Sequence, residues 1–167
     1  MQFSGLLAEG AAGPWIALGS DVLQLGLAYA LALPIGWNRE QEGRSAGLRT
    51  FPIVSVAACG FAMIGTGLPG TTPDTYSRIL QGLITGIGFI GGGAILRDKE
   101  GVTGTATAAS IWNIGIVGAA VGLGLYQIAL VLTVINLLTL EVLTPFKHRL
   151  DSRRAASAGA KRNSHSK

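Results

Sequence analysis

The stretch that decides the fold is ILQGLITGIGFIGGGAIL, which runs from Ile79 to Leu96. It contains six glycines among isoleucine, leucine and phenylalanine residues, and it carries no charge. In water, each glycine inside a helix costs about 0.8–1 kcal/mol relative to alanine, which disfavours a helix. In a bilayer, an unpaired backbone group is far more costly, and a helix pairs its own backbone groups. The stretch therefore predicts a membrane-spanning helix.

The spacing of the glycines predicts how such a helix packs. Glycines four residues apart lie on one face of a helix, where they let the backbone of a neighbouring helix come close. A second apolar segment, farther along the chain, has small residues at the same spacing. The helix-packing positions predicted from the two segments are Gly82, Gly86, Gly88, Gly92, Gly115, Gly118 and Gly122.

The same glycines match a nucleotide-binding pattern by letter. Residues Gly86 to Gly91 read G-x-G-x-x-G, which binds a dinucleotide only between a strand and a helix, with an acidic residue about twenty positions later. Here the flanking residues continue the apolar run, and position 111 is an isoleucine. Close helix packing explains the pattern better than nucleotide binding.

Composition extends the membrane prediction to most of the chain. Hydrophobic residues make up 49% of the 167 residues and charged residues 13%, against about 25% charged residues in soluble domains. Only two charged residues lie between Arg49 and Arg97, and only Glu141 is charged between Glu100 and Lys147. These intervals are long enough for several spans of about 20 residues. We therefore predict an all-α polytopic membrane protein.

Five spans fit the apolar segments. Glycines near residue 122 divide the last apolar segment into two spans, because one continuous helix of about 60 Å would exceed a hydrocarbon core of about 30 Å. Residues 1–20 are expected to form an interfacial or loosely ordered lead-in, and residues 146–167 a basic, disordered tail after a membrane domain of residues 21–145. The predicted spans are residues 21–37, 51–67, 79–96, 105–122 and 126–143.

The distribution of basic residues predicts the orientation. With five spans, twelve of the thirteen lysines and arginines fall on one side of the membrane, and only Arg78 falls on the other. Loops rich in lysine and arginine remain in the cytoplasm. The amino terminus is therefore expected outside and the tail inside, where its basic residues would contact anionic lipid rather than nucleic acid.

The connector between the first two spans is one group of candidate functional residues. Its arginines and glutamates either form a solvated loop that fixes orientation, or pair with each other and cap helix ends to hold the spans together. A threonine in this group is also the expected N-cap of the second span. The candidate connector residues are Asn38, Arg39, Glu40, Arg44, Arg49 and Thr50.

Polar residues inside the spans form a second group. Thr107, Asn113 and Asn136 are candidates for hydrogen bonds between helices. Glu141 lies near the inner end of the fifth span, where it either reaches the interface or, if it faces the bundle, forms an ion or proton site.

The sequence assembles no catalytic group. Both histidines lie in the tail, the single Cys59 has no cysteine to pair with, and no Cys/His spacing matches a zinc site. We therefore expect no enzyme activity, no metal site and no cofactor.

Four segments of the chain share the order and spacing of a known membrane family: Gly36–Glu40, Arg44–Thr50, Gly86–Leu96 and Thr107–Trp112. They resemble the membrane domain of the MgtC/SapB family. The resemblance implies a bacterial inner-membrane protein of about five spans, linked in some members to growth at low magnesium and survival inside host cells. The chain departs from the family pattern at Asn38, where the family usually has an acidic residue, and at Ala106, where the family usually has Asn or Thr.

Two functions follow from this resemblance. For the best-known branch of the family, it implies inhibition of the membrane ATP synthase. We therefore expect a regulator that contacts other membrane proteins, such as ATP synthase membrane subunits, or a second copy of itself. The alternative is a small transporter or channel for Mg2+ or protons, because glycine-interrupted helices also occur at transport sites.

Overall fold

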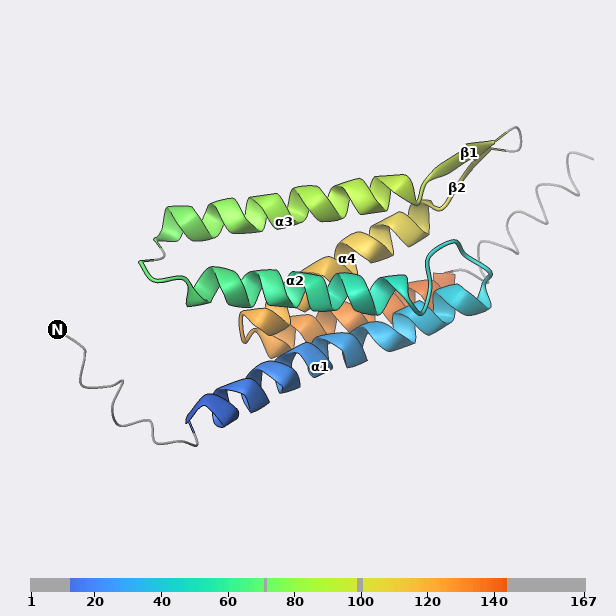
Figure 1. Ribbon diagram of the computed structural model, residues 1–167. Helices are drawn as coiled ribbons and strands as arrows, with labels where there is room; N and C mark the ends of the chain where they lie inside the picture. The colour runs from blue at the N-terminus through green and yellow to red at the C-terminus, as the bar shows by residue number, and fades with distance from the viewer. Residues whose placement is uncertain (1–12, 71, 99–100, 144–167) are drawn as a thin grey trace, which may run out of the picture.

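The computed structural model describes residues 13–70, 72–98 and 101–143. It confirms the all-α class, with five helices and one short hairpin (Figure 1). The fifth helix, residues Tyr126–Leu143, carries no label in the figure and follows α4. The labelled elements are α1 (Gly13–Gln41), α2 (Thr50–Gly67), α3 (Pro73–Gly93), β1 (Leu96–Asp98), β2 (Gly101–Thr103) and α4 (Thr105–Gly122).

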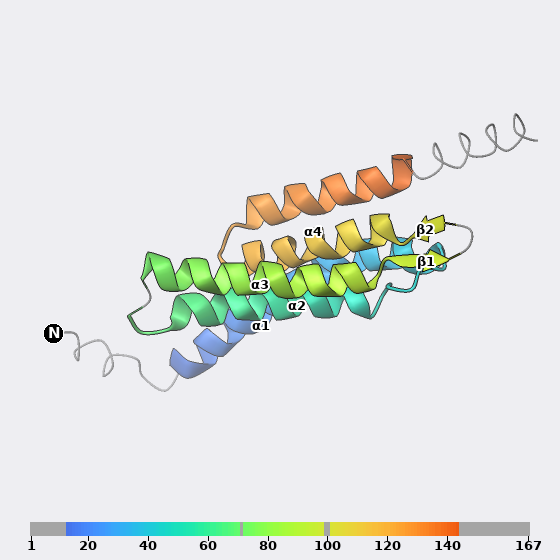
Figure 2. The same cartoon turned by 90° about the horizontal axis from the view of Figure 1, so that it is seen from above.

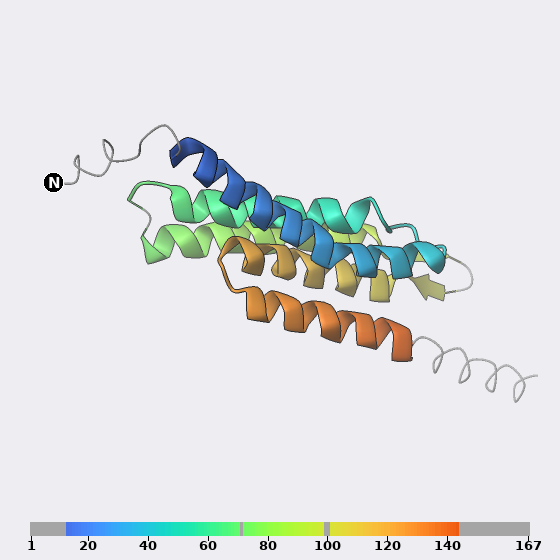
Figure 3. The ribbon, with the colours of Figure 1, turned by 90° about the horizontal axis from the view of Figure 1, so that it is seen from below.

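Helix α4 occupies the centre of the bundle. Eleven of its residues are buried, whereas α3 buries only Ile87 and Gly91. Helices α1, α2 and α3 all pack against α4, and the fifth helix runs along its remaining side (Figure 2). The view from below shows α1 crossing the bundle obliquely (Figure 3). The core is therefore built around a helix of small and β-branched residues that every neighbour can approach.

Four helices are long and apolar enough to cross a membrane, and the protein is a membrane protein. Helix α3 has 21 residues, enough for a span. It is less apolar than the other four helices because Asp74 and Arg78 lie in its first turns and six of its residues are glycines. The four apolar segments are Leu18–Gln41, Thr50–Gly67, Thr105–Gly122 and Tyr126–Leu143.

Two helices are longer than the predicted spans. Within the described residues helix α1 runs from Gly13, so it includes residues before the predicted start at residue 21. Helix α3 begins at Pro73 rather than Ile79, because Thr72 caps it: the Thr72 hydroxyl accepts a hydrogen bond from the Thr75 amide at 3.3 Å. The remaining predicted lead-in and the basic tail lie outside the described residues.

A β-hairpin follows the glycine helix. Helix α3 ends at Gly93, so Leu96, the last residue of the predicted span, belongs to β1 and pairs with Thr103. The hairpin closes onto α4 at Gly104, whose φ of 84° suits glycine. A Cβ at this position would also overlap the carbonyl oxygen of Ala94.

The glycines of α4 lie against neighbouring helices. A Cβ added at Gly115 would meet the side chain of Ile87 in α3. The equivalent atom at Gly118 would meet the carbonyl oxygen of Ser55 in α2. At Gly122 it would meet another α2 carbonyl, that of Cys59. Because these three residues of α4 are glycines, α2 and α3 can approach α4 closely.

The glycines predicted as packing positions on α3 do not pack within this chain. A Cβ added at Gly82, Gly86, Gly88 or Gly92 would meet no atom within 4 Å. Helix α3 instead contacts α4 through Ile87 and through Gly91, where an added Cβ would lie 3.2 Å from the carbonyl oxygen of Ala108. At 100° per residue, the two glycine pairs fall on either flank of this line of contact. The four-residue spacing identified faces of α3, but not the face that packs.

Candidate functional site

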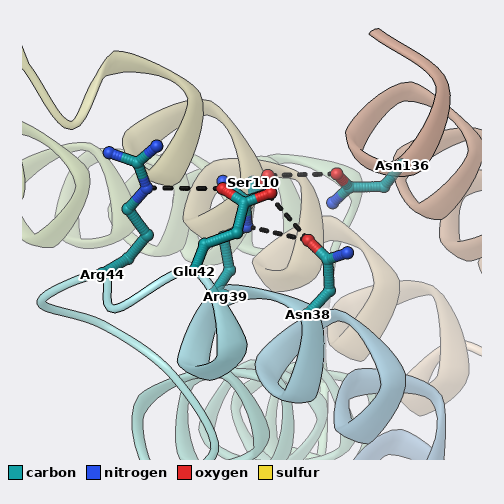
Figure 4. A network of polar contacts seen from close by, with 6 residues as sticks. All are labelled: Asn38, Arg39, Glu42, Arg44, Ser110 and Asn136. Carbon is teal, nitrogen blue, oxygen red and sulfur yellow. Dashed lines mark hydrogen bonds and ion pairs between the residues drawn. The ribbon is translucent and has the colours of Figure 1, made fainter. Parts of the chain in front are cut away.

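A buried arginine lies at one end of the bundle. Arg39, in the last turn of α1, is only 2% exposed. Its Nε and Nη2 groups donate hydrogen bonds to Oδ1 of Asn38 at 3.2 and 2.7 Å, and Nη2 also lies 3.1 Å from Oε1 of Glu42 (Figure 4). A cation at a helix C-terminus interacts favourably with the helix dipole. The guanidinium is therefore held by an amide, a carboxylate and the end of α1.

Glu42 joins two arginines of the connector. Its Oε2 atom accepts from Nε of Arg44 at 3.4 Å, while its other oxygen faces Arg39. Gly43, with φ of 63°, ends the helix, and the amide of Arg44 donates to the carbonyl of Arg39 at 3.1 Å. The chain thus turns tightly after α1 and places Arg44, which is 39% exposed, next to the Arg39–Glu42 pair.

Glu40 fastens the rest of the connector to α1. Its Oε2 atom accepts a hydrogen bond from the amide of Leu48 at 3.1 Å, and this carboxylate fills the space where a side chain on Gly47 would lie. A Cβ on Gly36 would lie 3.2 Å from the carbonyl oxygen of Gly47. Two glycines and one glutamate therefore fold the connector back along the end of α1.

The remaining connector residues begin α2. The N-cap is Arg49, which is exposed and makes no side-chain capping bond, so the predicted N-cap at Thr50 was wrong. Thr50 is the first helical residue, and its amide donates to the carbonyl of Gly47 at 3.1 Å. The structure thus brings together Asn38, Arg39 and Arg44, but leaves Arg49 at the surface.

The polar residues within the helices join α4 to the fifth helix. Ser110 Oγ donates to Oδ1 of Asn136 at 3.0 Å, and Nδ2 of Asn136 donates to Oδ1 of Asn113 at 3.3 Å. Thr107 is buried one turn before Ser110. Ser110 was not predicted from the sequence, although it lies midway between Thr107 and Asn113, at the three-residue spacing of one helix face. Figure 4 draws the Ser110–Asn136 pair together with the Arg39 group.

Glu141 lies on the exposed side of the fifth helix. Its exposure is consistent with a side chain that reaches the membrane interface, and the alternative of an ion or proton site stays a prediction. Within residues 13–70, 72–98 and 101–143, no three His, Cys, Asp or Glu residues lie close enough to hold a metal ion together.

One end of the bundle therefore presents a polar cluster, formed by Asn38, Arg39 and Glu42, at the connector between α1 and α2. A model of the MgtC family matches residues 25–149, which include the connector, the glycine helix and the intrahelical asparagines Asn113 and Asn136. The chain belongs to the MgtC family. The matched residues include Asn38, Arg39 and Glu42, so the polar cluster lies within the region that defines the family.

Alignments with three relatives show how much of this MgtC family chain, and of each relative, the similarity covers. It is 36% identical to SrpB of Synechococcus elongatus over 141 residues, covering 77% of this chain and 76% of the relative. It is 35% identical to MgtC of Salmonella typhimurium over 141 residues, covering 84% of this chain but 60% of the relative. It is 34% identical to YhiD of Escherichia coli, a candidate magnesium transporter by its name, over 77% of this chain and 63% of YhiD. No solved structure matches the chain.

Proposed function

We propose that this MgtC family protein is a non-enzymatic regulator located in the bacterial inner membrane. It acts through helix contacts with a second copy of itself or with another membrane protein. The observation that carries the proposal is the open surface of α3. A Cβ added at any of its four spaced glycines would meet no atom within 4 Å among the described residues, and the neighbouring Phe89 is 85% exposed.

Open glycines on a membrane helix favour contact with another helix. Apolar residues gain little by leaving lipid for protein, so helices in a bilayer associate where small residues allow close packing and many van der Waals contacts. The four open glycines on the flanks of α3 allow such a close approach, which no described residue of this chain uses, and a partner helix would use it.

Two apolar grooves border α3 and fit the same function. The groove between α2 and α3 has a volume of about 230 Å³, and Gly82, Gly86 and Phe61 are among its lining residues. The groove between α3, α4 and the start of the fifth helix has a volume of about 310 Å³ and is lined by Leu80, Ile84 and other apolar residues. A helix packed on α3 would fill space that otherwise holds lipid chains.

The first partners to test are a second copy of this chain and the membrane subunits of ATP synthase. The resemblance to the branch of the family that inhibits ATP synthase supports the latter, and the link of the family to low magnesium supports testing cells grown under magnesium limitation. The inner-membrane location rests on the same resemblance and on the four apolar helices.

The experiment compares leucine substitutions at open glycines on two helices. Gly86→Leu and Gly92→Leu place a side chain on the flanks of α3, whereas Gly26→Leu does so at an equally open position on α1. Each variant is cross-linked in native membranes and its partners are identified by mass spectrometry. The α3 variants should lose the partner that wild type retains, while Gly26→Leu keeps it. Retention of every partner by the α3 variants would contradict the proposal.

A transport function is the second candidate, favoured by the polar contacts of Ser110, Asn113 and Asn136 within the bundle. Purified protein in proteoliposomes tests it directly. Flux of Mg2+ or protons through the protein alone would establish transport and contradict a purely regulatory function. Copurification of ATP synthase subunits without flux would support regulation.

A further inference from the structure

The hairpin between α3 and α4 has no support from the described part of the bundle. Residues Gly101–Thr103 of β2 are all exposed, and so are Leu96 and Arg97 of β1. Each strand has only three residues. An isolated two-stranded hairpin is marginally stable in water, and three or more strands or a packed neighbour are needed to hold it. The hairpin therefore needs a surface outside the described residues to cover it.

Polarity changes along the length of the hairpin. At its base, next to the helices, Ile95, Leu96 and Val102 are exposed by 43%, 57% and 57%. The sequence between the two strands' apolar residues is charged, because Arg97 is followed by Asp-Lys-Glu. The exposed apolar residues at the base fit an apolar environment at that level.

The base of the hairpin lies where the membrane helices end. Helix α3 ends two residues before Ile95, and α4 begins two residues after Thr103. Trp37, near the end of α1, is 56% exposed at the same end of the bundle (Figure 1). Tryptophan is enriched at the level of the lipid headgroups. The apolar surface of the hairpin is therefore continuous with the lipid-facing surface of the helices.

Charge favours anionic headgroups. Arg97 pairs across the hairpin with Val102, so an exposed arginine and an exposed valine share one face. The connector between α1 and α2 lies at the same end of the bundle (Figure 1), and its Arg44 and Arg49 are exposed. Basic residues near an anionic membrane surface strengthen binding to it. A valine beside an arginine matches the boundary between acyl chains and phosphate groups.

We propose that the β1–β2 hairpin is a membrane-surface anchor, with Leu96 and Val102 in the headgroup region and Arg97 bound to anionic lipid phosphates. This proposal does not depend on the α3 partner surface. The anchor would hold the ends of α3 and α4 at one depth in the bilayer.

An environment-sensitive fluorophore tests the depth of the hairpin. The background is Cys59→Ala, which removes the single cysteine. A fluorophore is attached to Val102→Cys, and in a control protein to Ser45→Cys, an exposed residue of the connector. The full chain is reconstituted in phosphatidylcholine vesicles with or without phosphatidylglycerol. The fluorophore at residue 102 should emit at shorter wavelength than that at residue 45, and lipids with headgroup nitroxides should quench it more strongly.

A charge substitution then tests the lipid phosphate contact. Arg97→Gln should reduce the effect of phosphatidylglycerol on the fluorophore at residue 102, while Arg78→Gln, at the other end of α3, should leave it unchanged. High salt should weaken the wild-type effect, because salt screens exposed charges. Equal emission and quenching at residues 45 and 102 would overturn the proposal. So would quenching lost when the protein is concentrated in the bilayer, because a second copy would then cover the hairpin.

Discussion

Gly118 of α4 lies so close to the carbonyl oxygen of Ser55 in α2 that a Cβ atom on residue 118 would overlap it. The hydroxyl of Ser55 in turn donates to the carbonyl of Ala28 in α1 at 2.8 Å, in the buried core. Three helices therefore meet at one point through a missing side chain and one hydroxyl group. This contact fixes the distances between α1, α2 and α4.

Gly118→Ala is expected to lower the free energy of unfolding. The new methyl group would push α2 away from α4, and overpacking of this kind costs about 1–3 kcal/mol. Gly26→Ala provides the control, because a methyl group there meets no atom within 4 Å and alanine favours a helix by about 0.8–1 kcal/mol over glycine. Thermal unfolding in detergent should show a lower midpoint for Gly118→Ala only. Equal midpoints would mean that the backbone relaxes at no cost.

The glycines of α3 and α4 show what could and could not be predicted from the sequence. The four-residue spacing identified glycine faces in both helices, but local spacing does not reveal which face meets another helix. In α4 the face is covered by α2 and α3, whereas in α3 the contact falls on Ile87 and Gly91, between the two predicted faces. Tertiary contacts decide this difference, and no local pattern encodes them.

Helix boundaries were predictable where the signal was local. The fourth helix, residues 105–122, and the start of the fifth helix at residue 126 match the predicted spans, since Gly124, with φ of 72°, breaks the chain between them. The connector was harder, because Arg39, Arg44 and Arg49 look alike in sequence. Only the helical extension of α1 to Gln41 buries the first of them and leaves the other two exposed.

Arg39→Lys is expected to destabilise the protein although it keeps the charge. A lysine ammonium lacks the planar fork with which Arg39 reaches both Asn38 and Glu42. Loss of hydrogen bonds to a charged group costs about 1.5–3 kcal/mol, and Glu42 would keep a weaker partner. Chemical unfolding in detergent measures the change.

Arg44→Lys is the matched control for Arg39→Lys. Its side chain is 39% exposed and makes a single contact of 3.4 Å with Glu42, and exposed ion pairs contribute about 0.2–1 kcal/mol. The stability of this variant should stay close to wild type. If both lysine variants lost the same stability, burial of Arg39 would not be the cause.

Asn136→Leu is expected to loosen the fifth helix. The substitution removes both hydrogen bonds that join this helix to Ser110 and Asn113. Hydrogen bonds between membrane helices average about 0.6 kcal/mol, so the loss should be modest, about 1 kcal/mol in total. Thr139→Val is the control, because the Thr139 hydroxyl bonds only within its own helix, to the carbonyl of Ile135 at 2.7 Å. Cysteine cross-linking between α4 and the fifth helix should slow in Asn136→Leu and not in Thr139→Val.

The orientation of the bundle follows from charge and can be tested with matched serine-to-cysteine variants. Ser45 lies in the connector, at the end of the bundle with Arg39, whereas Ser77 lies near the start of α3, beside Arg78. Both serines are exposed, and both variants use the Cys59→Ala background. A five-span topology would place twelve of the thirteen basic residues on the Ser45 side, so we expect that side to be cytoplasmic. A membrane-impermeant maleimide should label Ser77→Cys in intact cells and Ser45→Cys only after permeabilisation, and the reverse pattern would place the connector outside the cell.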